Sequence, residues 1–286
     1  MKPLRIAILG LLLSSIAFAA EDISDLRKRA ESGDAAAQYR LGDRYVLGDG
    51  VSKDAAEAVK WYRKAAEQGD ARAQTSLGVM YGGVIGVPKD LVEGVKWTRK
   101  AAEQGYANAQ YNLGVAYDKG FGVIKDAAEA VKWTRKAAEQ GFVFAENDLG
   151  LMYDNGEGVP KDAVEAVKWY RKAAEQGLVF AENDLGYMYC TGNGVPKDAV
   201  EAVKWYRKAA EQGLAVAQYN LGVMHADGDG VIKDAVEAHA WFNVAGARGN
   251  ETAKTNLATL EKTMTREQIA KATELAKVYF EKYGKN

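Results

Sequence analysis

Few residues in this 286-residue chain could carry out chemistry. The chain has two histidines, His225 and His239, and a single cysteine, Cys190, which cannot form an internal disulfide. The sequence contains neither a Ser-x-x-Lys nucleophile motif nor a plausible Ser/His/Asp grouping. We therefore expect a protein that is not an enzyme, with no catalytic residue and no cofactor.

Metal binding is not expected either. The segment 226–230, Ala-Asp-Gly-Asp-Gly, looks faintly like a calcium-binding loop but lacks the full spacing and the terminal glutamate. Residues 82–86 stand at the same place in a 36-residue repeat, are expected to fold in the same way and contain no acid. His225 takes a position that other repeats fill with tyrosine, and His239 falls in a helix, so we interpret both as substitutions at packing positions.

The 36-residue repeat organises almost the whole chain. The motif Lys-Ala-Ala-Glu-Gln-Gly occurs five times at this interval. All six tryptophans keep the same interval: Trp61, Trp97, Trp133, Trp169, Trp205 and Trp241. A period of this length is typical of a solenoid, in which each unit buries its apolar face against its neighbours.

Each repeat predicts two helices. In the first repeat the apolar residues from position 37 to 45 recur every four residues, which predicts a helix A. Helix B is expected over residues 55–68, with Asp54 and Glu57 as a capping box at its start and a left-handed Gly69 at its end. Gly42 lies inside helix A, where we expect it to permit a close helix contact that a β-carbon would block.

The whole pattern resembles the Sel1-like repeat, a longer relative of the tetratricopeptide repeat. It reads Ala-Gln-x-x-Leu-Gly-x-x-Tyr, then Gly-x-Gly-Val-x-x-Asp, then Ala-x-x-Trp-x-x-Lys-Ala-Ala-x-x-Gly, as it stands between Ala109 and Gly141. The resemblance implies an all-α fold, an α/α solenoid of 36-residue helix-loop-helix repeats forming a right-handed superhelix. It also implies an adaptor or scaffold, a kind of protein that bacteria often export.

The chain is expected to have four parts. Residues 1–19 have the positive start, apolar run and small-x-small cleavage site of a secretory signal peptide. Residues 20–33 are expected to form an N-terminal capping half-repeat and residues 34–249 six Sel1-like repeats. Residues 250–286 are expected to form a partial repeat and a capping helix.

The leader and the charge balance predict where the protein works. A cleavable leader with no cysteine after it predicts a periplasmic or secreted protein that has neither a lipid anchor nor a membrane span. Removing the leader takes Lys2 and Arg5 from the 38 basic residues and none of the 39 acidic ones, so the net charge becomes −3. Such a balance gives no indication of a nucleic-acid surface. We expect a monomer whose partner is a protein or peptide.

The partner-binding surface is expected on helix A, which by resemblance to tetratricopeptide arrays lines the concave face. Several helix A positions vary between repeats, so packing does not fix them, and they gather aromatic residues in the middle of the chain. Exposed patches of this kind often mark interaction sites. The predicted partner-binding residues are Tyr111, Phe144, Asn147, Leu151, Phe180, Asn183, Tyr187 and Tyr219. Asp148 and Asp184 border them.

Two alternatives stay open. Phe144 and Phe180 either bind a partner or pack under the next repeat, because residues 141–176 and 177–212 differ at only five positions and one phenylalanine can be a copy of the other. The protein either acts as an adaptor for an envelope protein, or it binds peptidoglycan-type or β-lactam ligands with weak β-lactamase-like activity. The resemblance to cysteine-rich Sel1-like proteins implies the second function, but those proteins carry a disulfide in each repeat.

Overall fold

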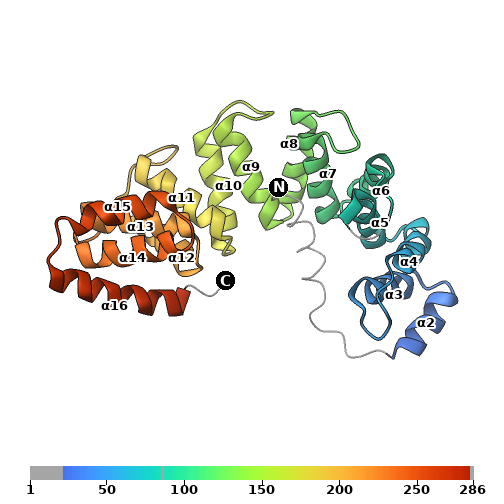
Figure 1. The fold of residues 1–286 in the computed structure, drawn as a ribbon. Helices are drawn as coiled ribbons and strands as arrows, with labels where there is room; N and C mark the ends of the chain where they lie inside the picture. The colour runs from blue at the N-terminus through green and yellow to red at the C-terminus, as the bar shows by residue number, and fades with distance from the viewer. Residues whose placement is uncertain (1–21, 85–86, 284–286) are drawn as a thin grey trace. The chain divides into compact units, whose positions relative to one another are not determined.

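The structure, a computed structural model, describes residues 22–84 and 87–283. Every regular element in these ranges is a helix, and the helices follow the 36-residue repeat, so the predicted all-α solenoid is confirmed. The predicted leader, residues 1–19, lies outside the described residues. The helices form two compact units (Figure 1). The first unit ends at Ala145 and includes Glu157–Val159, and the second contains Glu146–Gly156 and resumes at Pro160.

The first unit begins with a single helix and continues as helix pairs. Its helices are α2 (Ile23–Glu31), α3 (Ala35–Leu47), α4 (Ala55–Glu67), α5 (Ala71–Val79), the π-helical turn η2 (Met80–Val84), α6 (Leu91–Glu103), α7 (Ala107–Lys119) and α8 (Ala127–Glu139). The helix α9 (Val143–Asn155) begins in this unit and continues in the second.

The second unit holds the remaining pairs and two further helices. They are α10 (Ala163–Glu175), α11 (Val179–Thr191), α12 (Ala199–Glu211), α13 (Ala215–Asp227), α14 (Ala235–Ala247), α15 (Glu251–Glu261) and α16 (Arg266–Tyr283). The odd-numbered helices from α3 to α13 are the predicted helices A. The even-numbered helices from α4 to α14 are the predicted helices B.

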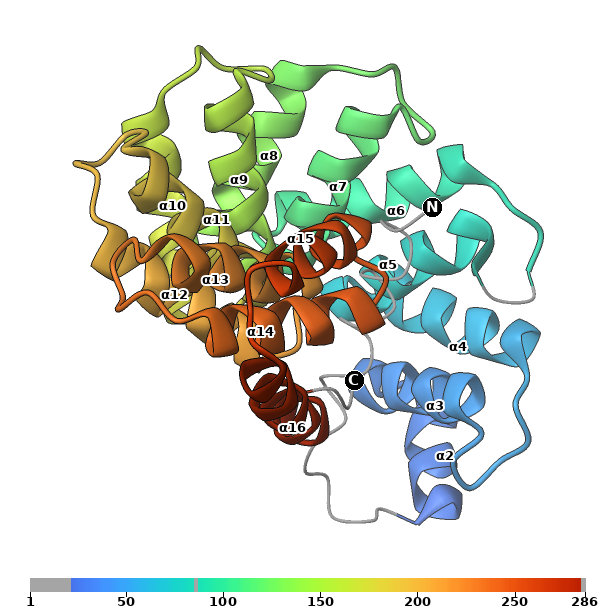
Figure 2. The same ribbon diagram turned by 60° about the vertical axis from the view of Figure 1, so that its left-hand side comes forward.

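Packing runs along the chain in both units. Within a unit a helix A lies against the helix B of its own repeat, as α3 does on α4 and α13 on α14, and a helix B lies against the next helix A, as α4 does on α5 and α12 on α13 (Figure 2). The apolar core is therefore shared between repeats: Tyr62 of the first repeat and Leu77 and Trp97 of the second belong to one buried cluster. A repeat removed from its neighbours would leave half of this cluster in water, which is why the array folds as a series.

The glycine inside helix A allows a close approach of helix B. A β-carbon at Gly42 would lie 2.6 Å from Cδ1 of Tyr62, and one at Gly186 would lie 2.8 Å from Cδ1 of Tyr206. Both distances are shorter than a carbon contact tolerates. The prediction that this row of glycines serves helix contact is confirmed.

The predicted capping box of helix B is half right. Asp54 Oδ1 accepts hydrogen bonds from two backbone N–H groups of the first turn, at 2.9 and 3.0 Å. The prediction of a reciprocal bond, from the backbone N–H of Asp54 to the side chain of Glu57, is wrong. That N–H donates to the carbonyl of Tyr45 instead. In three other repeats the glutamate of the box accepts from the tryptophan four residues later, as Glu129 Oε2 does from Nε1 of Trp133 at 3.0 Å. In the first repeat Nε1 of Trp61 has no hydrogen-bond partner among the described residues. A buried indole N–H needs an acceptor, and residues four apart share a helix face.

Residues 82–84 do not fold like residues 226–228 at the same place in the repeat, contrary to the expectation from the sequence. α13 ends at Gly228, which has the left-handed φ of 77°. The same position in the second repeat is Val84, and a β-branched residue avoids this conformation. The left-handed residue there is Gly83, one position earlier, with φ of 81°, and it lies within the π-helical turn η2.

Polar side chains join the two helices in the first five repeats. Gln68 Nε2 at the end of α4 donates to Gln38 Oε1 at 2.7 Å, and Gln38 Nε2 donates to the carbonyl of Ala30 at 3.0 Å. In α11 the corresponding residue is Glu182, which is 3% exposed and accepts from Gln212 Nε2 at 2.7 Å. Burial raises the pKa of Glu182.

The C-terminal helix α16 covers the end of the second unit, where it packs on α14 (Figure 2). The predicted capping box at its start is reciprocal: Thr265 and Gln268 each accept the backbone N–H of the other, at 3.2 and 2.8 Å. The ring of Tyr279 stacks on Trp241 with centroids 4.4 Å apart, and its hydroxyl donates to Glu237 at 2.9 Å.

Candidate functional site

Three of the predicted partner-binding residues are exposed, and all three belong to the second unit. Phe180 and Tyr187 on α11 are 53% and 52% exposed, and Leu151 on α9 is 38% exposed. Phe180 and Tyr187 are seven residues apart, so they share one face of α11 at a distance of about two helical turns. Val216, at the position of Phe180 in the next repeat, is 42% exposed on α13.

Two of the predicted residues are buried, so the expectation that their helix A position faces solvent is wrong. Tyr111 is 9% exposed and its ring packs on Phe142, with centroids 5.2 Å apart. Asn147 is 8% exposed, and Tyr39 at the same position of the first repeat is 8% exposed. In the first unit this position lies under aromatic neighbours, since the ring of Tyr39 packs on Tyr62 at 5.8 Å.

Phe144 and Phe180 occupy the same repeat position but have different surroundings. Phe144 is half-buried, and its ring packs edge-on against Phe142 with centroids 5.8 Å apart. The residue that corresponds to Phe142 before α11 is Leu178, which offers no ring. Phe144 therefore belongs to an aromatic contact inside the first unit, whereas Phe180 projects from the second.

Asn183 and Tyr219 are half-buried and connect neighbouring helices A. Asn220 Nδ2 on α13 donates to Asn183 Oδ1 on α11 at 3.1 Å. Asn256 Nδ2 on α15 donates to the Tyr219 hydroxyl on α13 at 3.4 Å. These two predicted residues therefore hold α11, α13 and α15 in register.

Three carboxylates of the second unit act electrostatically on a buried tyrosine. Burial raises the pKa of Tyr170 on α10, and the negative charges of Asp184, Asp154 and Asp148 act in the same direction. Burial raises the pKa of Asp184 to about 6, and the negative charge of Asp154 acts in the same direction. The sequence identified Asp148 and Asp184 as the border of the patch but gave no sign that Asp154 joins them.

Both histidines are buried, so the interpretation of both as packing residues is confirmed. His225 is 7% exposed, and its Nε2 lies 3.3 Å from Nη2 of Arg207. In other repeats the corresponding arginine contacts the hydroxyl of a tyrosine, as Arg171 does with Tyr189. His239 is 1% exposed, with Nε2 3.0 Å from a carboxylate oxygen of Glu261. Burial lowers the pKa of His225.

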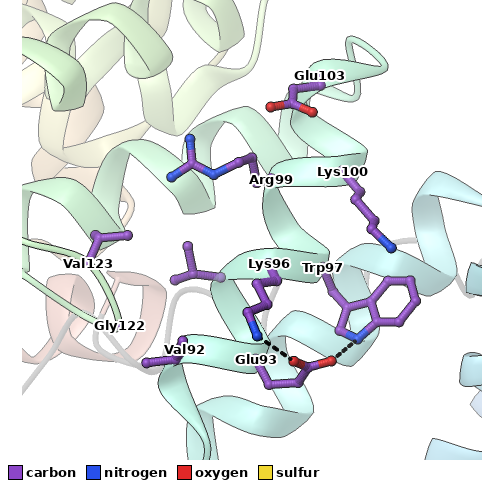
Figure 3. Close-up of a pocket in the computed structure, with 10 residues that line it drawn as sticks. Val92, Glu93, Lys96, Trp97, Arg99, Lys100, Glu103, Gly122 and Val123 are labelled. Carbon is purple, nitrogen blue, oxygen red and sulfur yellow. Dashed lines mark hydrogen bonds and ion pairs between the residues drawn. The ribbon is translucent and has the colours of Figure 1, made fainter.

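A shallow pocket of about 390 Å³ lies on α6 in the first unit, on the outer face of helix B (Figure 3). Glu93 crosses its floor, where its two oxygens accept from Lys96 at 3.3 Å and from Trp97 Nε1 at 2.9 Å. Arg99, Lys100, Glu103 and the valines 92, 95 and 123 complete its wall. Both acidic and basic groups line it, so it does not present charge of one sign to a ligand. Helix B carries the same charged residues in other repeats, and the sequence therefore gave no signal for it.

Neither a metal centre nor a spanning helix is found in the part of the chain that the structure describes. In residues 22–84 and 87–283 no cluster of three or more His, Cys, Asp or Glu side chains could hold a metal ion. Within the same ranges no helix has the length and apolar character to cross a bilayer.

Comparison with known proteins identifies the repeat. The Sel1 repeat matches six consecutive segments: 35–70, 71–106, 107–142, 143–178, 179–214 and 215–250. The crystal structure of c5321, a protective antigen present in uropathogenic Escherichia coli strains that displays an SLR fold, is 40% identical over 92% of this chain, with a TM-score of 0.83. This chain covers 56% of c5321, a little more than half of its length.

A second solved structure agrees. A Sel1 repeat protein from Oxalobacter formigenes is 36% identical, with a TM-score of 0.66, and the match covers 79% of this chain and 97% of that one. No curated protein matches the chain. With six matched repeats in series and the same fold in a 40% identical relative, the chain belongs to the Sel1 repeat family.

Proposed function

We propose that this protein is an exported, non-enzymatic scaffold that binds a protein or peptide partner through helices A of its second unit. Sel1 repeat proteins are generally protein-interaction scaffolds. The binding surface is the exposed strip, which we define as Leu151, Phe180, Tyr187 and Val216. The protein acts as a monomer in the periplasm or outside the cell.

The exposure of Phe180 and Tyr187 is the observation that carries the proposal. Each aromatic side chain buries a large apolar area when it is covered, and leaves about half of its surface in water here. Their helix A has its own core side already filled by residues such as Leu185 and Met188, which are 0% and 1% exposed. The strip is therefore additional to the core, and aromatic anchors of this kind supply much of the binding energy at interfaces.

Export has separate support. Residues 1–19 have the organisation of a signal peptide. The 40% identical relative from Escherichia coli is a protective antigen, and a protein that immunity can reach is accessible outside the cytoplasm. The N-terminal sequence of the protein recovered from a periplasmic extract tests this part: a chain that begins at Ala20 supports it, and a chain that begins at Met1 in the cytoplasm contradicts it.

Partner capture tests the scaffold function. The purified protein is immobilised and exposed to a cell-envelope extract, and bound proteins are identified by mass spectrometry. The test variant is Phe180→Ala/Tyr187→Ala. The matched control is Val164→Ala/Val200→Ala, because these two valines are 54% and 53% exposed in the same unit but lie at the start of helices B.

The expected result is a partner retained by the wild type and the control and lost by the test variant. All three proteins should show the same helical circular dichroism, because none of the four side chains is buried. A partner held equally by the wild type and the test variant contradicts the strip, and the absence of any captured partner contradicts the scaffold function. We found no observation in the described residues that favours the alternative binding of peptidoglycan-type or β-lactam ligands.

A further inference from the structure

His225 of α13 takes the place of a tyrosine in a contact that recurs along the array. In four other places an arginine donates to the hydroxyl of the tyrosine eighteen residues later, on the next helix A, as Arg99 does to Tyr117 at 2.8 Å. In the second unit Nη2 of Arg207 on α12 lies 3.3 Å from Nε2 of His225. The contact therefore crosses the interface between α12 and α13, which belong to successive repeats.

This contact determines where the imidazole carries its proton at neutral pH. A guanidinium group has no acceptor, so Nε2 of His225 accepts from Arg207 and the ring hydrogen lies on Nδ1. The side chain is 7% exposed, and its Nδ1 has no hydrogen-bond partner among the described residues. A second proton has to bind at Nε2, where it would replace the acceptor lone pair with an N–H group that points at a cation.

Charged groups act on His225 from α12 and α14, the helices that pack on α13. Burial lowers the pKa of His225, the negative charges of Glu237 and Asp234 oppose this, and Arg207 on α12 acts in the same direction as burial. Both acids have other partners: Asp234 accepts from two backbone N–H groups as the cap of α14, and Glu237 accepts from the Tyr279 hydroxyl of α16 at 2.9 Å. A protonated His225 therefore breaks its contact with Arg207 without a free carboxylate to receive it.

A buried base whose pKa is lowered destabilises the closed interface in acid. Once the interface opens, the exposed imidazole binds a proton at about pH 6.5, whereas the closed interface binds it only at lower pH. The free energy that holds α12 and α13 together is therefore fully present well above pH 6.5 and falls as the pH decreases through that value. A tyrosine in the same place does not change its charge between pH 5 and 8.

The same interface divides the exposed strip. Phe180 and Tyr187 lie on α11, before the interface, and Val216 lies on α13, beyond it. Asn220 Nδ2 on α13 donates to Asn183 Oδ1 on α11 at 3.1 Å, and a buried apolar cluster joins α12, α13 and α14. Neither the amide contact nor the apolar cluster titrates near neutral pH, so acid acts on the interface through the imidazole.

We propose that His225 is an acid-sensitive contact between α12 and α13, whose protonation opens this interface and detaches Val216 from the rest of the strip. The consequence for a bound partner rests on the proposed scaffold function. Each repeat of a solenoid contacts only its neighbours, so an opening at one interface can stay local. The strip is then complete at neutral pH and divided in acid.

Hydrogen exchange of the full chain tests this contact without a partner. The test variant is His225→Tyr, which restores the hydroxyl acceptor of the other repeats. The matched control is His239→Val, because His239 is 1% exposed on α14 and the same position holds valine in the other repeats, as in Val203. Protection factors, corrected for the pH dependence of intrinsic exchange, are measured for amides of α10, α13 and α14 at pH 7.5 and 5.5.

The protection of α13 and α14 should fall about three- to tenfold further in the wild type than in His225→Tyr between these two pH values. The opening takes up at most one additional proton, with a midpoint of about 6.5 in the open state, which sets the upper limit. His239→Val should keep the response of the wild type. Amides of α10, on the other side of the interface, should show no difference between the wild type and His225→Tyr.

The same pH response in the wild type and in His225→Tyr overturns the proposal, and so does a response that His239→Val removes. An equal additional loss of protection in α10 also overturns it, because the second unit would then lose stability as a whole and not at one interface. Partner capture at neutral pH tests the scaffold function separately, since His225 is buried and lies outside the strip. The two proposals can therefore fail independently.

Discussion

Replacing Asp184 with asparagine should stabilise the protein above pH 6. The folded state holds this carboxyl partly buried beside Asp154, on a helix that packs over Tyr170, and its pKa rises from 3.8 to about 6. An acid with a raised pKa binds more protons in the folded than in the unfolded state between pH 4 and 6. Its contribution to stability is therefore present at low pH and is lost as the pH rises through the folded pKa.

The magnitude follows from the shift. About two pH units correspond to about 3 kcal/mol of free energy of unfolding at pH 7, an upper bound because Asp184 is partly exposed. The asparagine also offers Nδ2 to Asn147 Oδ1, as Asn220 does to Asn183, for about 1 kcal/mol. We expect Asp184→Asn to be about 1–3 kcal/mol more stable than the wild type at pH 7.5 and nearly equal to it at pH 4.

Urea denaturation followed by circular dichroism at several pH values between 4 and 8 measures this difference. The comparison must be between variant and wild type at each pH, because Asp43, whose pKa burial also raises to about 6, titrates in the same range in both. Glu175→Gln serves as the exposed control. A gap that does not change with pH, or a variant that is less stable at pH 7.5, would refute the reasoning.

Three further changes test the packing. Glu182→Gln should raise the free energy of unfolding, and more so as the pH rises, because it removes a buried carboxyl with a raised pKa. It also supplies an amide donor like that of Gln110, the equivalent residue two repeats earlier, which donates to the carbonyl of Ala102 at 3.2 Å. An equal gain at pH 5 and pH 8 contradicts this. Gly186→Ala should lower the free energy of unfolding by about 1–3 kcal/mol, since its β-carbon would lie 2.8 Å from the Tyr206 ring, and an unchanged urea midpoint would show that the ring moves aside freely. Tyr279→Phe removes a hydrogen bond to a carboxylate worth about 1.5–3 kcal/mol, so amide exchange in α16 should accelerate while that in α10 stays the same.

Much of the fold could be read from the repeat, because a single packing solution is used many times. The row of Gly42 and the aspartate caps each follow from one local rule, and each holds in several repeats. The exception is instructive: the second repeat has valine where the others end helix A with glycine, and the turn there is rebuilt around Gly83. The partner of Glu129 was missed, although the spacing of four residues to Trp133 was visible.

The candidate site was less predictable, because exposure on helix A depends on residues one repeat away. Tyr111 and Phe144 are covered by Phe142, a turn residue that has no counterpart ring before α11. A phenylalanine at one repeat position therefore packs in one repeat, as Phe144, and projects in the next, as Phe180. Variation between repeats at one helix A position shows that packing does not fix the residue type there. It does not show in which repeats the side chain reaches solvent.

Asp184 lowers the stability of the second unit at neutral pH, because its pKa is raised in the folded state. Asparagine at the next repeat, Asn220, shows that this fold accepts an amide there and gains a hydrogen bond from it. The acid at position 184 instead leaves Asn147 Oδ1 without a donor and faces Asp154.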